Sequence, residues 1–225
     1  TSRDAEMNNF TSLVKLGIKD LIEFHSVSLT DFRNVLQVLE KVAPNEIYNL
    51  SGQSSVGLSF EQPLETLESI AIGTINILES MRFIGADFHL YNATSSESYG
   101  DRGDQPANEK TPFNPKSPYG VAKASAFWQV ANYRESYGLF ACSGIMFNHE
   151  SILRPKRFVT RKICKAAARI ALGSNEMLEL GDITIKRDWG WAPEYVIAMW
   201  MMLQQKNAED FVIATGHLSS LREFI

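Results

Sequence analysis

The run EIYNL at residues 46–50, taken together with DFHLYNA at residues 87–93, decides the fold class of this chain. Both runs are rich in aromatic and aliphatic residues and predict β-strands. Between them, beyond Pro63, apolar or small residues recur at helical spacing at Leu64, Leu67, Ile70, Ala71, Thr74, Ile75 and Leu78. A strand, a helix and a second strand predict a parallel pair of strands joined by a helical crossover.

The same alternation extends to both sides of this unit. On the N-terminal side, residues 20–27 predict a strand, and residues 29–42 predict a helix capped by Thr30. On the C-terminal side, residues 119–137 predict a helix and residues 140–147 a strand. We therefore expect an α/β fold with a doubly wound parallel sheet, whose ligand site lies at the carboxyl ends of the strands.

The pattern changes beyond Asn148. The elements predicted there are a helix at residues 158–172 that ends at Gly173, two short strands around Gly181 and Trp189, and a helix at residues 193–204. The run DFVIA at residues 210–214 predicts one more buried strand.

Composition excludes several classes of protein. With 225 residues, 44% hydrophobic and 21% charged, the chain is neither fibrous nor disordered. The longest apolar run, residues 195–203, has nine residues, about half of what a membrane span needs. The net charge of −4 argues against nucleic acid as a partner. Two cysteines far apart predict neither a disulfide framework nor a metal site, and they suit a reducing, cytoplasmic setting.

Both ends of the sequence predict that the chain is an internal piece of a longer protein. The N-terminus has neither an initiator Met nor the pattern of a signal peptide. At the C-terminus, SLRE at residues 220–223 has the pattern of a capping box, which predicts the start of a helix. The sequence continues for only about one helical turn beyond it.

The pair Tyr119 and Lys123 is the most informative candidate for chemistry. Residues four apart share one face of a helix, so an ammonium would lie beside a phenol. The free phenol has a pKa of about 10, and a fixed positive charge nearby favours the phenolate that an acid/base catalyst needs. The spacing taken alone is also that of a surface lysine on an amphipathic helix.

A hydroxyl-rich turn, Thr94-Ser95-Ser96-Glu97, follows the strand predicted at residues 87–93. A loop at the carboxyl end of that strand would overhang the same crevice as the Tyr119 helix. Hydroxyl donors and a carboxylate would then face Tyr119. Such a sequence also suits a simple hydroxyl-bonded turn with a solvated glutamate.

Longer motifs accompany these residues: IMFNHES at residues 145–151, FVTRKI at 158–163, KRDWG at 186–190 and DFVIATG at 210–216. Together they closely resemble the GDP-mannose 4,6-dehydratase family, a branch of the extended short-chain dehydrogenases/reductases, over nearly the whole chain. The resemblance implies a Rossmann-like sheet that lacks its first strand, turn and helix. It implies an N-terminally truncated NADP-binding domain at residues 1–150 and a mainly substrate-binding part at 151–225, with residues 210–214 returning to the sheet.

The resemblance also implies a reaction and its catalytic residues. GDP-D-mannose would become GDP-4-dehydro-6-deoxy-D-mannose with loss of water, and NADP would be the cofactor. Tyr119, supported by Lys123, would take the O4 proton while hydride leaves C4, and Ser95 would hydrogen-bond the new carbonyl. Glu97 would remove the C5 proton, which the ketone has acidified, and return it to the departing C6 hydroxyl.

Cofactor and substrate residues follow from the same resemblance. The cofactor set is Arg3, Leu29, Leu50, Ser51, Gly52, Gln53, Ser54, Tyr119, Lys123, His149 and Arg154. Arg3 would meet the 2′-phosphate of NADP, although it is equally a solvated terminal residue, and His149 would lie near the nicotinamide unless it only satisfies a buried backbone group. The substrate set is Ser54, Ser96, Asn148, Lys162 and Arg187.

Positive charge is concentrated between Arg154 and Arg169, where no carboxylate occurs. The cations are Arg154, Lys156, Arg157, Arg161, Lys162, Lys165 and Arg169. A solvated helix face usually interleaves both signs, so this run favours a phosphate-bearing ligand or a partner subunit. The resemblance implies a homodimer or homotetramer.

Some positions depart from the family pattern. Ser95 replaces Thr, Ser28 stands where Asp is frequent, Glu65 where Tyr is frequent, and Ile152 where proline is usual. No G-x-x-G-x-x-G occurs anywhere, so the turn that holds a cofactor pyrophosphate is missing, and we expect this piece alone to bind NADP poorly.

Two other readings stay open. A sugar-nucleotide reductase or epimerase of the same superfamily would share Tyr119 and Lys123, but it would not need Glu97 for elimination at C5. A non-catalytic binding domain would keep the fold and lose turnover, which the joint presence of Ser95, Glu97, Tyr119 and Lys123 disfavours.

Overall fold

A computed structural model describes residues 1–5, 10–103 and 105–225. The chain divides into two compact units, one of Thr1–Ile145 and Met199–Val212, the other of Met146–Ala198 and Ile213–Ile225. The first boundary lies a few residues before the predicted one at residue 150. No helix among the described residues combines the length and the apolar character that a membrane crossing requires.

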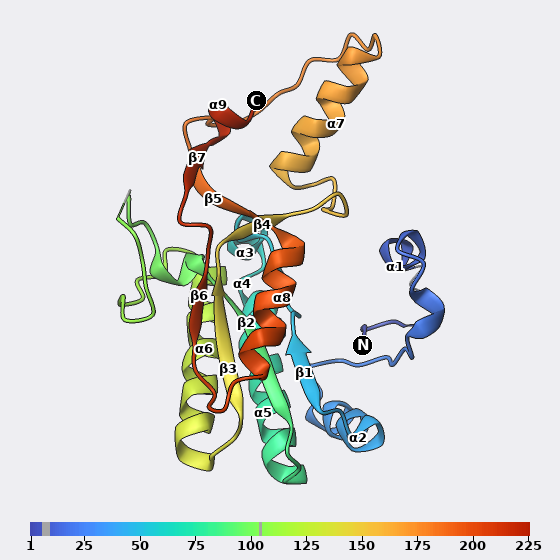
Figure 1. The fold of residues 1–225 in the computed structure, drawn as a ribbon, viewed down its shortest axis with the longest axis vertical. Helices are drawn as coiled ribbons and strands as arrows, with labels where there is room; N and C mark the ends of the chain where they lie inside the picture. Colours follow the sequence, from blue (N-terminus) through green and yellow to red (C-terminus); the bar gives the residue numbers. More distant parts are fainter. Residues whose placement is uncertain (6–9, 104) are drawn as a thin grey trace. The chain divides into compact units, whose positions relative to one another are not determined.

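A four-stranded sheet forms the centre of the first unit, in the order β1-β2-β3-β6 (Figure 1). Its strands are β1 (Glu46–Asn49), β2 (His89–Ser95), β3 (Ala141–Met146) and β6 (Phe211–Ile213). β1 and β2 are parallel, with Glu46 opposite His89. The strands predicted at residues 46–50, 87–93 and 140–147 are therefore confirmed, and the strand predicted at 210–214 lies beside β3.

Helices pack along this sheet because their apolar faces must be buried. The long ones are α2 (Phe32–Val42), α5 (Gly73–Ile84) and α6 (Pro118–Tyr137). In Figure 1, α5 and α6 run alongside the strands and α2 lies near the start of β1. α5 packs against both α2 and α6. Their contact buries a core that includes Val35, Leu78, Met81, Leu90 and Val130. At about 25 cal/mol per Å² of apolar surface, this burial is the main stabilising contribution to the unit.

A π-helical turn, η2 (Glu68–Ile72), interrupts the helix predicted to follow Pro63. η2 lies between α4 (Pro63–Leu67) and α5. A further helix, α3 (Val56–Glu61), comes before α4, and the sequence did not predict it. Gly52 packs directly on η2, because a Cβ there would come within 2.5 Å of the Ile70 side chain. The loop that follows β1 therefore rests on this turn.

The N-terminal region differs from the prediction. Residues 20–27 form no strand; the structure has a short 3₁₀ helix, η1 (Lys19–Leu21), and a single parallel bridge between Ser2 and Ser26. The α2 cap is Asp31 and not Thr30, because the Asp31 carboxylate accepts a hydrogen bond from the Asn34 amide. The short helix α1 (Thr11–Lys15) buries no residue.

The second unit contains a three-stranded sheet in the order β4-β5-β7. Its strands are β4 (Asn148–Glu150), β5 (Lys186–Trp191) and β7 (Leu218–Ser220), and β5 runs parallel to β4 and antiparallel to β7. α7 (Val159–Ala171) and α8 (Ala192–Leu203) confirm two predicted helices; α8 begins in this unit, and its residues from Met199 onward belong to the first. α9 (Leu221–Phe224) carries the predicted capping box at Ser220. The strand predicted around Gly181 is absent from the described residues.

Candidate functional site

The first turn of α6 presents Tyr119 and Lys123. Ser117 accepts a hydrogen bond from the Gly120 amide at 3.0 Å and so caps the helix, and Pro118 occupies the first helical position. Tyr119 packs on a small apolar cluster of Ile70, Ala122 and Ala126. The phenol and the ammonium are therefore fixed by one rigid helix end.

Lys123 is buried, with only 7% of its surface exposed. Its Nζ atom donates a hydrogen bond of 2.7 Å to the carbonyl oxygen of Ala93 and lies 5.9 Å from the centroid of the Tyr119 ring. Burial lowers the pKa of the Lys123 ammonium to about 8. Lys123 is thus a core group near a phenol, and the alternative of a surface lysine is excluded.

Ser95, Ser96 and Glu97 lie where β2 ends and a 3₁₀ turn, η3 (Ser96–Tyr99), begins. The Ser95 hydroxyl oxygen accepts a hydrogen bond from the Glu97 amide at 3.3 Å, so Ser95 caps the turn and keeps its own proton as a donor. All three residues are partly exposed. The hydroxyl-rich segment is both a capped turn and a solvent-accessible polar surface.

The turn η3 packs against α6. One close approach joins Glu97 to Gly120: a Cβ placed on Gly120 would lie 2.7 Å from the Glu97 carbonyl oxygen. The structure therefore brings the backbone of Glu97 next to the residue that follows Tyr119, at the same end of β2. Of the predicted catalytic set, Ser95, Glu97, Tyr119 and Lys123 all come from this one junction of β2, η3 and α6.

The predicted cofactor loop of Leu50, Ser51, Gly52, Gln53 and Ser54 follows β1. Asn49 holds its start, because the Asn49 side-chain oxygen accepts hydrogen bonds from the amide and the hydroxyl of Ser51. The Gln53 amide donates to the Ser69 hydroxyl at 3.2 Å, in the turn η2. The loop is thus anchored at both ends, and Leu50 and Ser54 are left exposed.

Two predicted cofactor residues lie earlier in the chain. Arg3 is exposed and pairs with Glu65, with 3.6 Å between the charged groups. Leu29 lies against Gly73 of α5, and its carbonyl oxygen accepts a hydrogen bond of 2.7 Å from the Asn76 side chain. Glu65, which departs from the family pattern, is therefore the partner of the arginine expected to meet the 2′-phosphate.

In the second unit, Asn148 and His149 form the start of β4 rather than the end of the preceding strand. His149 lies opposite Gly190 in β5, its Nδ1 is 3.0 Å from the Phe147 carbonyl oxygen, and its ring stacks on Tyr195 at 4.7 Å. A methyl group on Gly190 would overlap the Tyr195 ring. Tyr195 thus supports the imidazole, which the sequence did not predict.

The predicted phosphate-binding cations of this unit have protein partners. The Arg154 side chain pairs with Glu150 at 3.2 Å and lies 3.6 Å from the Phe158 ring centroid. Lys162 Nζ donates to the Glu179 carbonyl oxygen at 2.6 Å. Arg187, on β5, is exposed, and its guanidinium donates to the Lys186 carbonyl oxygen.

Asp188 is a structural carboxylate that sequence reasoning missed. It is 4% exposed and accepts three hydrogen bonds, from the Thr215 amide and hydroxyl and from the Gly216 amide. The sequence signal that could have indicated this buried carboxylate is its position between Arg187 and Trp189 in a predicted strand. Its role is to tie β5 to the segment that leads into β7.

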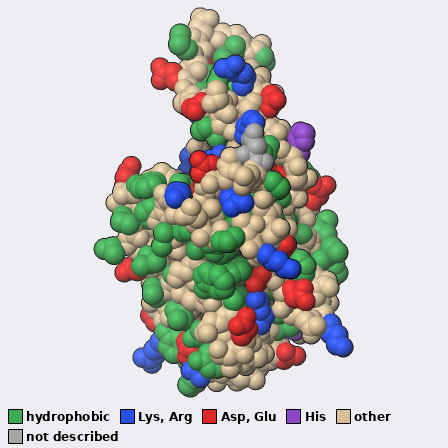
Figure 2. Space-filling model, turned by 90° about the vertical axis from the view of Figure 1, so that its left-hand side faces the viewer, with side chains coloured by type: hydrophobic (Ala, Val, Ile, Leu, Met, Phe, Trp, Pro, Cys, Tyr) green, Lys and Arg blue, Asp and Glu red, His purple; other side chains and the backbone are tan. Residues whose placement is uncertain are grey.

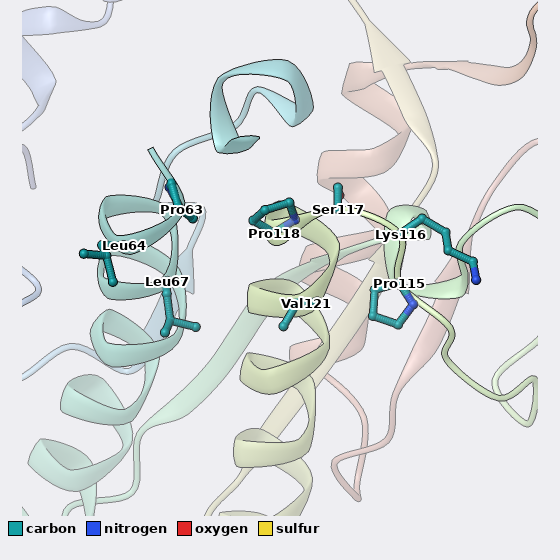
Figure 3. Close-up of a pocket in the computed structure, with 8 residues that line it drawn as sticks. All are labelled: Pro63, Leu64, Leu67, Pro115, Lys116, Ser117, Pro118 and Val121. Atoms are coloured by element: carbon teal, nitrogen blue, oxygen red, sulfur yellow. The ribbon is translucent and has the colours of Figure 1, made fainter. Parts of the chain in front are cut away.

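An apolar pocket of about 440 Å³ lies between α4 and α6 (Figure 3). Leu64 and Leu67 line one side and Pro118 and Val121 the other, while Lys116 points away from them. None of the predicted site residues lines it. This pocket therefore borders the first turn of α6, which carries Tyr119, but its lining does not include Tyr119 or Glu97.

The family model described as GDP-mannose 4,6 dehydratase matches residues 1–225. The chain belongs to the GDP-mannose 4,6-dehydratase family. Among relatives in this family, the GDP-mannose 4,6-dehydratase of Sinorhizobium fredii is 51% identical over 89% of this chain and 58% of its own length. The human GDP-mannose 4,6 dehydratase is 46% identical over 92% of this chain and 56% of its own length. The chain thus spans less than two thirds of these relatives.

Solved structures share the fold of this GDP-mannose 4,6-dehydratase family member. DesIV, a dTDP-glucose 4,6-dehydratase from Streptomyces venezuelae with NAD bound, has a TM-score of 0.85 at 20% identity and covers 96% of this chain and 65% of its own. RMD from Pseudomonas aeruginosa, complexed with NADPH, has a TM-score of 0.81 at 24% identity, covering 88% and 67%. At these identities the likeness establishes a Rossmann-like α/β fold.

Proposed function

We propose that the complete protein is a GDP-mannose 4,6-dehydratase, which converts GDP-D-mannose to GDP-4-dehydro-6-deoxy-D-mannose and water. Family membership over residues 1–225 carries this proposal. The junction of β2, η3 and α6 supports it, since it holds a phenol beside a buried ammonium and a carboxylate-bearing turn against the same helix end. A dehydratase needs these groups for proton transfer at O4 and at C5.

A nicotinamide cofactor fits the residues that are present, and we assign NADP. Gly52 supports this assignment, because its missing side chain lets the loop after β1 pack closely on η2, while Leu50 and Ser54 of the same loop are exposed. Arg3 supplies a cation for the 2′-phosphate. RMD is complexed with NADPH and DesIV has NAD bound, so both forms of the cofactor occur among structures of this fold.

The chain's own residues then act on the hexose in sequence. Tyr119 takes the proton from O4, Lys123 supports its phenolate, and Ser95 donates a hydrogen bond to the carbonyl that forms. The bound cofactor would supply hydride acceptance at C4 and hydride return at C6. Glu97 takes the C5 proton; the C5–H electron pair becomes the C5=C6 bond as the C6 hydroxyl leaves with that proton as water.

The overall reaction balances without an external oxidant. The cofactor would accept one hydride and return one hydride, and the proton held by Tyr119 balances the proton that C5 regains. Asn148, Lys162 and Arg187 would hold the substrate, with the two cations on the diphosphate. Ser54 and Ser96 would contact the sugar, and His149 and Arg154 the cofactor.

The decisive experiment incubates the purified complete protein with GDP-mannose and NADP. We expect a product lighter than the substrate by one water, with a 4-keto group and a C6 methyl group in its NMR spectrum. A C4-epimerised sugar or a deoxyhexose without the ketone would assign the protein to an epimerase or a reductase instead.

A homodimer or homotetramer is the assembly we assign to the complete protein. Exposed apolar side chains on the helices around α4 and α6 support it: Leu64 is 74% exposed and Trp128 62%. Figure 2 shows hydrophobic side chains gathered over the middle of one face. Light scattering of the complete protein would give the subunit number, and a monomer at micromolar concentration would refute this assignment.

The cytoplasm is the location we assign. Cys142 and Cys164 are both free thiols, and Cys142 is buried, so the fold uses no disulfide between them. That state suits a reducing compartment. Fractionation of cells that carry the complete protein at its natural level would test the assignment.

A further inference from the structure

Gly120 and Glu97 are in close backbone contact at the junction of β2, η3 and α6. A Cβ on Gly120 would lie 2.7 Å from the Glu97 carbonyl oxygen, 3.3 Å from the Glu97 carbonyl carbon and 3.0 Å from Pro115 Cβ. These are backbone and proline atoms, which have no flexible end to swing aside. Any side chain at position 120 must therefore displace either η3 or the start of α6.

The α6 side of this contact is firmly held. The Gly120 amide donates to the Ser117 hydroxyl at 3.0 Å, and the Val121 amide donates to the Ser117 carbonyl oxygen at 2.9 Å. In the turns that follow, Ala122, Ala124, Ala126 and Phe127 are buried, and Lys123 is tied to Ala93. Moving this end of the helix would break several buried contacts at once.

On the η3 side, Ser98 and Tyr99 are buried and well bonded: the Ser98 carbonyl oxygen accepts from the Asn114 amide at 3.0 Å, and the Tyr99 hydroxyl donates to the Asn108 carbonyl oxygen at 2.9 Å. Glu97, at the edge of this turn, is itself held only by long hydrogen bonds. The Glu97 amide donates to the Ser95 hydroxyl at 3.3 Å, and the Glu97 carbonyl oxygen accepts from the Gly100 amide at 3.3 Å. Both distances are at the long end for N–H···O hydrogen bonds. An added methyl group at position 120 is therefore expected to shift Glu97 and to leave Tyr119 and Lys123 in place.

We propose that Gly120 is a positioning residue that sets where Glu97 lies relative to Tyr119. The inference rests on the proposed function, in which Tyr119 serves proton transfer at O4 and Glu97 serves proton removal at C5. With glycine at position 120, the Glu97 carboxylate reaches C5 while Tyr119 serves O4. With a larger residue there, oxidation at C4 proceeds and proton removal at C5 is impaired.

The test is the variant Gly120→Ala in the complete protein, compared with Gly57→Ala. Gly57 lies in α3 with no atom within 4 Å of an added Cβ, so it controls for the helical substitution itself. We expect Gly120→Ala to lower the rate of water loss about 10–100-fold, the effect of a displacement near 1 Å, and to change the rate of C4 oxidation less than about threefold. Gly57→Ala should leave both rates unchanged.

Amide hydrogen exchange gives a readout that does not depend on turnover. In Gly120→Ala, peptides that cover residues 95–100 should exchange faster, while peptides that cover residues 118–137 keep their protection. Faster exchange in α6 as well, including complete failure to fold, would overturn the proposal, because the proposal requires that only the turn moves. Equal loss of C4 oxidation and of water loss would also overturn it.

A second variant separates Glu97 from Pro115. Pro115→Gly combined with Gly120→Ala removes the 3.0 Å contact and retains the 2.7 Å one. We expect water loss to stay impaired in the double variant; full recovery would make Pro115 the residue that matters and would refute the role of Glu97. Absence of the dehydrated product with the unaltered protein would sink the proposed function, while the exchange measurement would still test the contact.

Discussion

The Lys123 ammonium donates a hydrogen bond of 2.7 Å to the carbonyl oxygen of Ala93, at the point where β2 approaches its end. This bond ties α6, the helix that carries Tyr119 and Lys123, to β2, the strand that leads into the turn of Ser95 and Glu97. Because Lys123 is almost fully buried, its charge is held close to the Tyr119 ring without competition from bulk water. The protonation state of Lys123 should therefore affect the reaction rate and the free energy of unfolding, and both can be measured as functions of pH.

Catalysis should decline at alkaline pH. Burial lowers the pKa of Lys123 to about 8, so the ammonium that we propose to support the Tyr119 phenolate is lost as the pH rises through that value. We expect kcat of the complete protein to fall about tenfold per pH unit above about 8. In Lys123→Arg, whose guanidinium keeps its charge, the rate should be lower but without this fall. A rate for the unaltered protein that is flat to pH 9.5 would contradict the assignment.

Stability should change with pH in the opposite direction. The folded protein releases the Lys123 proton at about pH 8, below the ordinary value of 10.5, so the unfolded chain binds more protons between these values. The contribution of Lys123 to the free energy of unfolding should therefore rise with pH across this window, by up to about 3 kcal/mol at about 1.4 kcal/mol per unit of pKa difference. Burial raises the pKa of the Cys142 thiol from 9.0 to about 12, so Cys142 contributes in the opposite direction above about pH 9, and the Lys123 contribution is read as the difference from a variant that lacks it. Urea titrations of Lys123→Met, which lacks this proton, should show no such rise.

Glu97 should be required for dehydration only. Glu97→Gln retains the size of the side chain and removes the base, so the complete protein should lose about 100-fold or more in water loss while it binds NADP as before. Product analysis and cofactor titration measure the two properties. Glu135→Gln, an exposed change near the other end of α6, is the matched control. Unchanged production of the 6-deoxy sugar by Glu97→Gln would remove Glu97 from its assigned role.

Cofactor preference should respond to Glu65. Its carboxylate lies 3.6 Å from the Arg3 guanidinium and competes with a 2′-phosphate for it. Glu65→Gln should strengthen NADP binding about two- to threefold, which is the scale of an exposed ion pair, and should leave NAD binding unchanged. Calorimetric titration of the complete protein with both cofactors measures this. An equal gain for NAD would show that Arg3 does not contact the 2′-phosphate.

The end of α2 offers a stabilising change. Ala43 adopts a left-handed conformation, with φ of 43°, after Val42. Glycine has no steric penalty there, so Ala43→Gly should raise the free energy of unfolding by about 0.5–1 kcal/mol. The matched reverse change is Gly85→Ala at the left-handed end of α5, where φ is 67°, and it should lower stability by a similar amount. Denaturant unfolding measures both, and a loss of stability in Ala43→Gly would contradict this account.

The sequence predicts those parts of the fold whose physics is local. β2 and α6 were predicted because aromatic runs and four-residue spacing depend on neighbours along the chain. The π-helical turn η2 was not, because the apolar spacing of residues 64–78 fits an uninterrupted α-helix and does not show where one turn widens. The three-residue strands β4 and β7 are too short to show a period.

The candidate site likewise has features that the sequence predicts and features that depend on tertiary contacts. Tyr119 and Lys123 could be placed on one helical face from their spacing alone. The approach of Gly120 to Glu97 and the stacking of His149 on Tyr195 are tertiary contacts, which no spacing along the chain encodes. The strand predicted at residues 20–27 failed for a related reason, since a short apolar stretch becomes a strand only with a partner along its length, and here the pairing is limited to Ser2 and Ser26.

The position of β1 at one end of the strand order has a practical consequence. The outer edge of a terminal strand offers unpaired backbone groups to other molecules, and here Tyr48 and Leu50 are exposed beside it at 37% and 58%. Copies of the 225-residue chain expressed by itself should therefore associate through this edge and aggregate as their concentration rises. Solubility, more than intrinsic fold stability, would then limit the concentrations at which this chain can be handled.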